Sequence, residues 1–176
     1  AINASNGNVY VAGYGKTSAL YWVNGQKSEI PANGYVYVNA MFVSGSDVYI
    51  AGEVRPVDRK PIAQYWKNGS PVALTDGTRK AVLNSIWVDG NDVYAAGLEQ
   101  DDRGVNHAKY WKNGTATELD GEEAKGITVV NAQAYMTGWE IVSNQTTIAK
   151  FWINDKSFAL PNMDNGLIAG TAIVVK

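Results

Sequence analysis

The 176-residue sequence contains no cysteine and only one histidine, His107. The lack of cysteine excludes disulfide bonds, thiol catalysis and cysteine-ligated metals, and one histidine cannot build a multi-histidine metal centre. No apolar run reaches the ~18 residues of a membrane-spanning helix, so we expect no membrane insertion. Charged residues make up only 18% and the formal net charge is −2. Without a basic excess, we expect no nucleic-acid partner.

What the sequence does contain is an internal repeat with three markers. The first is Tyr-Trp-Lys-Asn-Gly at 65–69 and 110–114, with variants at 21–25 and 151–155. The second resembles Val-Tyr-Val-Ala-Gly and precedes each copy of the first, at 9–13, 48–52, 93–97 and 134–138. The third starts at residues 1, 40, 85, 126 and 171. These starts define repeats of about 1–39, 40–84, 85–125 and 126–170, and the segment 171–176 looks like one further first strand.

Each repeat reads as four short strands joined by turns. In the third repeat we expect strands at 85–88, 93–98, 107–112 and 115–119, with an Asp-Gly hairpin after the first and an Asn-Gly hairpin after the third. No stretch shows the 3.6-residue apolar period of a helix. Repeats of ~40–50 residues with four strands are typical of β-propellers. The sequence therefore predicts one all-β domain, a β-propeller of four-stranded antiparallel blades.

The same motifs resemble those of uncharacterised bacterial repeat proteins, mostly secreted or attached to the cell surface, which carry Val-Tyr-Val-Ala-Gly and Tyr-Trp-Lys-Asn-Gly in each propeller blade. The resemblance covers essentially the whole chain and departs from the pattern at Val23, Ile153 and Asp155. It implies a propeller fold and an extracytoplasmic location, and it carries over no catalytic residue.

The number of blades leaves two alternatives. In the first, which we favour, four blades close into a ring, and one of the two first-strand segments, at 1–5 or 171–175, pairs within it. In the second, the chain is part of a larger propeller, and 171–176 opens a further blade. A closed ring has the advantage that it leaves no open sheet edge.

Recurrent aromatics are expected in the core. Trp22, Trp66, Trp111 and Trp152 occupy one slot of the third strand, where a large ring can pack between neighbouring blades. Asn39 and Asn84 share a slot facing the central channel, with Lys125 and Gly170 as counterparts, and amides there could hold ordered water.

Candidate binding residues lie where the second strand of each repeat ends. The loops between second and third strands are longer and more variable than the hairpin turns, which favours them as binding loops. The candidates are three carboxylates and two aromatics that follow the second-strand glycine: Tyr14, Glu53, Glu99, Trp139 and Glu140. The carboxylates could bind sugar hydroxyls or Ca²⁺, although no calcium-loop motif is present. The alternatives are a solvated polar rim for the carboxylates and a cap on the blade edge for the aromatics.

Three functions remain in competition, because no catalytic motif is present and the fold alone implies none. The first is a non-enzymatic module that binds a glycan or another small polar ligand. Its binding face is formed by the loops between second and third strands and by the connections between repeats, at 31–35, 75–80, 120–125 and 161–166. The second is a protein-interaction scaffold within a larger surface protein. The expected partner is a glycan in the first case and a protein in the second. The third is a hydrolase or lyase with paired carboxylates, which ranks last because nothing marks such a pair. We expect no cofactor, with Ca²⁺ as the one weak candidate.

Overall fold

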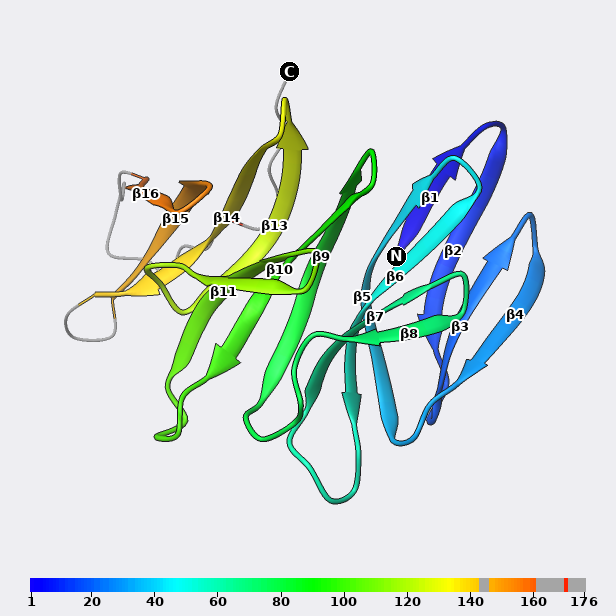
Figure 1. Cartoon of the computed structure of the whole chain (residues 1–176), viewed down its shortest axis with the longest axis horizontal. Coiled ribbons are helices and arrows are strands. Elements are labelled where there is room, and N and C mark those ends of the chain that lie inside the picture. The colour runs from blue at the N-terminus through cyan, green and yellow to red at the C-terminus, as the bar shows by residue number, and fades with distance from the viewer. Residues whose placement is uncertain (143–145, 161–169, 171–176) are drawn as a thin grey trace.

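A computed structural model of the protein describes residues 1–142, 146–160 and 170. It contains four antiparallel sheets of four strands, and in each sheet the spatial order of the strands follows the chain. Figure 1 shows the four sheets as successive twisted blades. The prediction of an all-β propeller with four-stranded blades is confirmed. In the described ranges, no helix is long and apolar enough to cross a membrane.

The first two blades cover residues 2–73. Blade 1 comprises β1 (Ile2–Ser5), β2 (Asn8–Tyr14), β3 (Ser18–Val23) and β4 (Gln26–Pro31). Blade 2 comprises β5 (Tyr35–Ser44), β6 (Asp47–Arg55), β7 (Ile62–Lys67) and β8 (Ser70–Ala73).

The last two blades cover residues 81–159. Blade 3 comprises β9 (Ala81–Asp89), β10 (Asp92–Gln100), β11 (Asn106–Lys112) and β12 (Thr115–Glu118). Blade 4 comprises β13 (Glu123–Val130), β14 (Gln133–Ile141), β15 (Thr147–Ile153) and β16 (Lys156–Ala159). The first strands of blades 2 to 4 begin earlier than the sequence repeats, which start at residues 40, 85 and 126.

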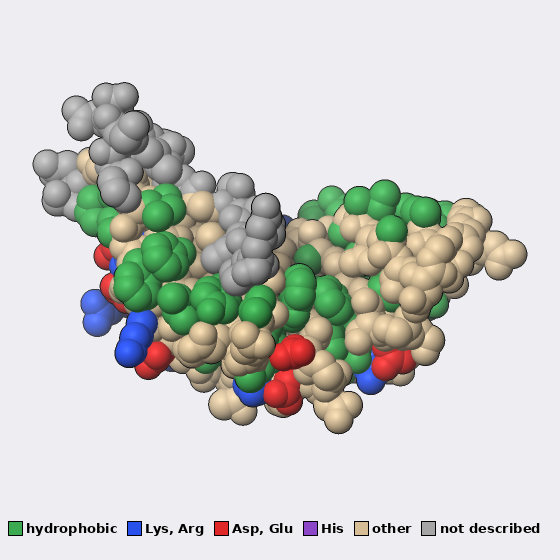
Figure 2. All heavy atoms as spheres, turned by 90° about the horizontal axis from the view of Figure 1, so that it is seen from above, with side chains coloured by type: hydrophobic (Ala, Val, Ile, Leu, Met, Phe, Trp, Pro, Cys, Tyr) green, Lys and Arg blue, Asp and Glu red, His purple; other side chains and the backbone are tan. Residues whose placement is uncertain are grey.

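The blades lie in a row, and their first strands are neighbours along it. β1 packs beside β5, β5 beside β9 and β9 beside β13. Blades 1 and 4 lie at opposite ends of this row (Figures 1 and 2). Of the two segments predicted to pair within a ring, the first pairs with β2 inside blade 1. The segment 171–175 lies outside the described residues, so closure of the ring stays a prediction.

Among the described residues, the core consists of three apolar clusters, one at each junction between blades. Trp66 belongs to the cluster between blades 1 and 2, Trp111 to that between blades 2 and 3, and Trp152 to that between blades 3 and 4. All three side chains are at most 1% exposed. The prediction that this slot packs between blades is therefore confirmed for them, whereas Trp22 of blade 1 is only partly buried.

The Tyr-Trp-Lys-Asn-Gly motif is explained residue by residue in blade 3. Tyr110 packs toward blade 4 and Trp111 toward blade 2, because successive strand residues point to opposite faces. Lys112 pairs with Asp92 at 2.9 Å. Asn113 and Gly114 both have positive φ, as a type I′ hairpin requires. The Asn113 side chain also accepts a hydrogen bond from the Val93 amide at 2.9 Å, so the turn clamps the start of β10.

The glycine of the second marker is required by a bulge in the neighbouring strand. In blades 2 to 4 the register between first and second strands shifts opposite this glycine. A Cβ added to Gly52 would lie 1.9 Å from the carbonyl oxygen of Tyr37, and one on Gly97 would lie 1.9 Å from that of Val82. Only glycine permits this approach. The bulge was not predicted from the sequence.

Candidate functional site

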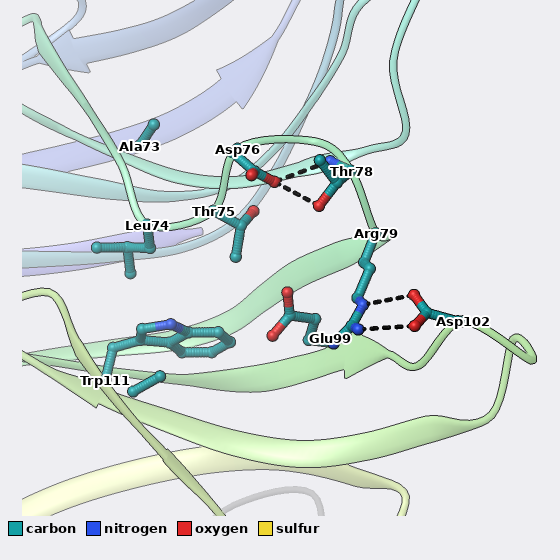
Figure 3. A pocket seen from close by; sticks show the side chains of 10 residues that line it. Ala73, Leu74, Thr75, Asp76, Thr78, Arg79, Glu99, Asp102 and Trp111 are labelled. Carbon is teal, nitrogen blue, oxygen red and sulfur yellow. Dashed lines mark hydrogen bonds and ion pairs between the residues drawn. The ribbon is translucent and has the colours of Figure 1, made fainter.

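A cleft of about 690 Å³ opens between blades 2 and 3, on the side of the long loops. It is bordered by the end of β8, by the connection 74–80 that leads to β9, and by β10 to β12 of blade 3. Figure 3 shows Glu99 between the ring of Trp111 and the side chain of Arg79. The lining is polar at the rim and apolar at the floor: Ala73, Leu74, Thr75, Asp76, Thr78, Arg79, Glu99, Asp102, Trp111 and Ala116.

The cleft owes its width to the course of the connection 74–80. Leu74 still continues the pairing with blade 2, since its amide donates to the Ala63 carbonyl at 2.8 Å. Thr75 then accepts a hydrogen bond from the Ala63 amide at 3.1 Å. Beyond it the Gly77 carbonyl accepts a hydrogen bond from the Lys60 amide at 2.9 Å. The connection therefore leans on the loop of its own blade and leaves the space beside Trp111 open.

Two polar turns hold the rim in shape. Asp76 accepts hydrogen bonds from both the amide and the hydroxyl of Thr78, at 2.9 and 2.7 Å. These bonds lower the pKa of Asp76, so this carboxylate is charged at neutral pH. Across the cleft, Asp101 in the loop of blade 3 accepts from the amides of Arg103 and Val105, each at 2.9 Å. Both turns fix loop backbone by local hydrogen bonds.

An arginine–carboxylate pair bridges the two blades at the rim. Arg79 donates two hydrogen bonds of 2.9 Å to Asp102, one from Nε and one from Nη2. This pairing raises the pKa of Arg79. The Arg79 side chain is 43% exposed and that of Asp102 is 82% exposed. Such an exposed pair is available to exchange its mutual bonds for bonds to a ligand.

Glu99, one of the predicted residues, forms the inner polar wall. Its carboxylate accepts a hydrogen bond from Lys109 Nζ at 2.5 Å, and both side chains are largely buried. The pair is aligned because Gly97 pairs with Lys109 and Glu99 lies two residues further along β10, on the same face. Glu99 is therefore a fixed acceptor beside the apolar floor.

Glu140 is the counterpart of Glu99 at the junction of blades 3 and 4. It lies two residues after Gly138, and Lys150 takes the place of Lys109. Lys150 contacts Glu140 at 2.7 Å and Asp120 at 2.6 Å. Burial opposes the charge of Lys150, yet the hydrogen bonds and charges of the two carboxylates outweigh it and raise the pKa of this lysine. Asp120 belongs to the connection between blades, which thus closes over the Glu–Lys pair.

Glu53 and Tyr14 meet in a different place, around Tyr37. Glu53 is buried and accepts a hydrogen bond from Arg55 Nη2 at 2.6 Å. The Arg55 guanidinium lies 4.3 Å from the centroid of the Tyr37 ring, and the rings of Tyr14 and Tyr37 lie 5.3 Å apart. Glu53 follows its glycine by one residue and Glu99 by two, so the two carboxylates lie on opposite faces of their blades.

Trp139 is anchored within the polar network at blade 4. Its Nε1 donates to Glu123 Oε2 at 3.2 Å. The other oxygen of Glu123 accepts from the amide of Asn84 at 2.8 Å. The five predicted residues thus separate into several places, and only Glu99 lines the cleft. No shared site forms from them in the described part of the chain.

The side-chain amides of Asn39 and Asn84 form hydrogen bonds between neighbouring blades. Asn39 donates to the Leu83 carbonyl at 2.8 Å, and Asn84 donates to the Ala124 carbonyl at 2.9 Å. Each lies in the bulge of its first strand and reaches the equivalent position of the next blade. These bonds explain the recurrence of asparagine in this slot without a bound ligand.

His107 lies near two carboxylates, with Glu118 at 3.3 Å and Asp101 at 3.6 Å. Within the described ranges, no group of three or more His, Asp or Glu side chains is placed to hold a metal ion. The calcium hypothesis therefore has no described cluster in its support.

The sequence placed the connection 75–80 on the expected binding face, but it did not single out Thr75, Asp76 and Arg79, which build one wall of the cleft. Their signal was the length of the second repeat, which is longer than the third. The extra residues lie in the connection 74–80, whereas the corresponding connection of the third repeat spans only 119–122. Repeat length therefore indicated where the regular packing is interrupted.

No protein-family model and no curated protein matches this chain. Among solved structures, the chain is similar to a Bombyx mori GH32 β-fructofuranosidase, with a TM-score of 0.48 and 8% sequence identity. The similarity covers 89% of this chain and 46% of that protein, so the chain spans less than half the length of the structure it matches.

Proposed function

We propose that the protein is a non-enzymatic binding module and that its ligand is a small polar molecule, with a glycan as the favoured class. The supporting observation is the cleft between blades 2 and 3, where Asp76, Glu99 and the Arg79–Asp102 pair converge above an apolar floor. Concave sites with an apolar base and a few fixed polar groups are typical of small-ligand binding.

The chemistry of the rim favours a ligand rich in hydroxyl groups. A sugar hydroxyl both donates and accepts, so it can bond a carboxylate and a guanidinium at once. Glu99 and Asp76 supply fixed acceptors, and Arg79 supplies donors. Leu74, which is only partly buried at the floor, suits the apolar face of a ring. From the motif resemblance we also propose an extracytoplasmic location.

A binding role is favoured over hydrolysis by the state of the carboxylates. A general acid needs a raised pKa, whereas the Thr78 hydrogen bonds lower the pKa of Asp76. Glu99 is held by Lys109, and Asp102 is held by Arg79. Each carboxylate thus serves as a preset hydrogen-bond acceptor.

The test is a glycan-array screen of the purified protein in calcium and again in EDTA, followed by calorimetry with the selected sugar. Arg79→Ala combined with Asp102→Ala removes the exposed bridge, and we expect about tenfold to hundredfold weaker binding. The matched control is Lys27→Ala with Glu29→Ala, another exposed ion pair, at 3.1 Å in blade 1. We expect the control to bind like the wild type.

A blank array from a folded, monodisperse sample would reject the glycan proposal. Equal loss in the two double variants would reject the cleft as the site. Binding that is lost only in EDTA would instead show that a metal ion takes part in ligand binding. After a blank array, a protein-interaction scaffold would be the next candidate, and the partly exposed apolar face of blade 1 favours it.

A further inference from the structure

A second cleft, of about 410 Å³, lies at the junction of blades 1 and 2, which are neighbours in the row of blades (Figure 1). It is bordered by the connection 32–34, by the loop 56–61 of blade 2 and by β7. Trp66 lines it, together with the apolar side chains of Val54 and Ile62. All of its lining residues are described, and none lies at an end of the row. The second cleft is therefore independent of how the row of blades ends.

Within the described residues, the second cleft contains a buried hydrogen-bond donor that has no partner. Trp66 is 1% exposed, and its Nε1 contacts no acceptor in this part of the chain. Its counterpart in blade 4, Trp152, donates from Nε1 to the Asp120 carbonyl at 3.2 Å. A buried N–H group that is left without a partner is destabilising. An acceptor group that reaches Trp66 Nε1 would therefore be bound favourably.

The course of the connection explains why Trp66 does not bond to it as Trp152 does. Gly34 and Gly121 occupy similar places before the first strand of the next blade, with φ of 141° and 148°. A Cβ on Gly121 would lie 3.0 Å from the Trp152 ring, whereas one on Gly34 would lie 2.4 Å from the Arg55 carbonyl oxygen. The connection between blades 1 and 2 thus crosses beside Arg55. It leaves Trp66 without the carbonyl that covers Trp152.

The inner wall of the second cleft is uncharged. Gln64 occupies the slot that Lys109 fills in blade 3, and Val54 occupies that of Glu99, because both blades keep the same register relative to the second-strand glycine. The exchange replaces an ion pair with one amide in apolar surroundings. The lining carries charge only at residues 58–59, which are exposed on the loop of blade 2. A charged group would lose its hydration at the inner wall without gaining an opposite charge, so the wall favours a neutral group.

An amide group matches the polar atoms of this wall. Trp66 and Gln64 lie on one face of β7, two residues and therefore about 7 Å apart. Trp66 Nε1 is a donor only, and the Gln64 side chain offers both a donor and an acceptor. A trans secondary amide presents its carbonyl and its N–H in opposite directions, so it can bond to both side chains.

We propose that the second cleft is a further binding site, whose ligand is an uncharged secondary amide with a small acyl group, such as an acetamido group. The carbonyl accepts a hydrogen bond from Trp66 Nε1 and the N–H donates to Gln64. The methyl group packs on Val54 and Ile62, which line the cleft. The exposed side chain of Asn33 borders the cleft, and such side chains change rotamer fast enough to admit the group.

Two kinds of molecule carry this group, N-acetylated amino sugars and peptides, and the chemistry of the second cleft is common to both. The inference uses a different cleft from the proposed function and does not rest on it. Failure of the glycan proposal at the cleft between blades 2 and 3 would therefore leave this inference standing, and the reverse also holds.

The test follows the indole N–H signals of the six tryptophans by NMR of the isotope-labelled whole chain. Trp66→Phe identifies the signal of Trp66. Methyl N-acetyl-β-glucosaminide and N-acetylalanine methylamide are titrated separately to about 20 mM, with methyl β-glucoside as the matched compound without an acetamido group. We expect a saturable shift of the Trp66 signal with at least one acetamido compound and none with the glucoside. A shift with the sugar alone would identify an amino sugar, and a shift with the capped amino acid alone would identify a peptide.

The variant that blocks the site is Val54→Glu combined with Gln64→Lys, because it installs an ion pair that blades 3 and 4 already accommodate. We expect at least about tenfold weaker binding, with the fold checked by circular dichroism. The control, Lys27→Ala with Glu29→Ala, changes an exposed ion pair of blade 1 and should bind like the wild type. No saturable shift of the Trp66 signal with either compound would overturn the proposal, and so would undiminished binding by the folded blocking variant. The wild-type titration decides the proposal even if that variant does not fold.

Discussion

The junction between blades 2 and 3 and the junction between blades 3 and 4 start from the same parts. Both have a buried tryptophan from the later blade and a Glu–Lys pair beside it, Glu99 with Lys109 and Glu140 with Lys150. They differ in the connection that joins the two blades, 74–80 in one and 119–122 in the other. One junction has an open cleft of about 690 Å³ above its pair.

At the other junction the short connection crosses directly over the pair. A Cβ on Gly121 would lie 3.0 Å from the Trp152 ring, and Trp152 Nε1 donates to the Asp120 carbonyl at 3.2 Å. Asp120 also takes Lys150 as its partner. At these two junctions the blades repeat the same frame, so the length of the connection determines whether a junction has an open cleft or is sealed.

The largest expected effect concerns the two tryptophans. Trp152→Ala should lower the free energy of unfolding by about 3–5 kcal/mol, since it leaves a cavity in a sealed junction. Trp111→Ala should lower the free energy of unfolding by about 1 kcal/mol less than Trp152→Ala. Trp111 borders an open cleft, and only Trp152→Ala also removes a hydrogen bond, the one from Trp152 Nε1 to the Asp120 carbonyl. Urea unfolding followed by circular dichroism measures both. Equal costs would mean that the two junctions are packed alike and would break the comparison.

The next prediction exchanges the connections. Replacing residues 75–80 with Asp-Gly, the pair found at 120–121, should place the chain across the cleft as it runs at the other junction. Because the ligand would then compete with this segment, we expect at least about tenfold weaker binding of the sugar selected by the array. Calorimetry measures the affinity, and circular dichroism checks the fold. Undiminished binding by a folded variant would show that the cleft is not the site.

The smallest expected effect is a pH dependence confined to the sealed junction. The hydrogen bond from Lys150 holds the pKa of Asp120 below its ordinary value of 3.8. A carboxyl with a lowered folded-state pKa stabilises the fold above its unfolded-state pKa and loses this contribution as the pH falls through the lowered value. Asp120 is 66% exposed, so solvent screening reduces the effect to well under about 1 kcal/mol.

We therefore expect the wild type to lose slightly more stability than Asp120→Asn as the pH falls below about 4. Thermal melts across this range measure the difference, with Asp102→Asn as the matched change at the open rim. If the melting temperatures of the wild type and Asp120→Asn fall in parallel with pH, the Asp120–Lys150 pair does not stabilise the fold.

Much of the fold followed from the sequence alone. The recurring Tyr-Trp-Lys-Asn-Gly motif predicted the blades for two reasons. Asn and Gly adopt positive φ in hairpin turns, and a bulky ring that recurs at one slot needs a neighbouring blade to pack on. The site followed less well. The offset between Glu53 and Glu99 relative to their glycines was visible in the sequence, and the two-residue period of a strand already placed them on opposite faces. Arg79 could be assigned only when the loop of blade 3 was seen beside it.

The sequence by itself determined the repeat, the hairpins and the inward tryptophans, because these depend on local backbone preference and on a period that the chain displays directly. Only the tertiary structure decided where the repeat is interrupted. The connection 74–80 contacts the loop of its own blade, and Arg79 meets Asp102 across the junction. Such contacts join residues from different blades, so their geometry depends on how the blades are stacked and not on the order of residues within any one of them.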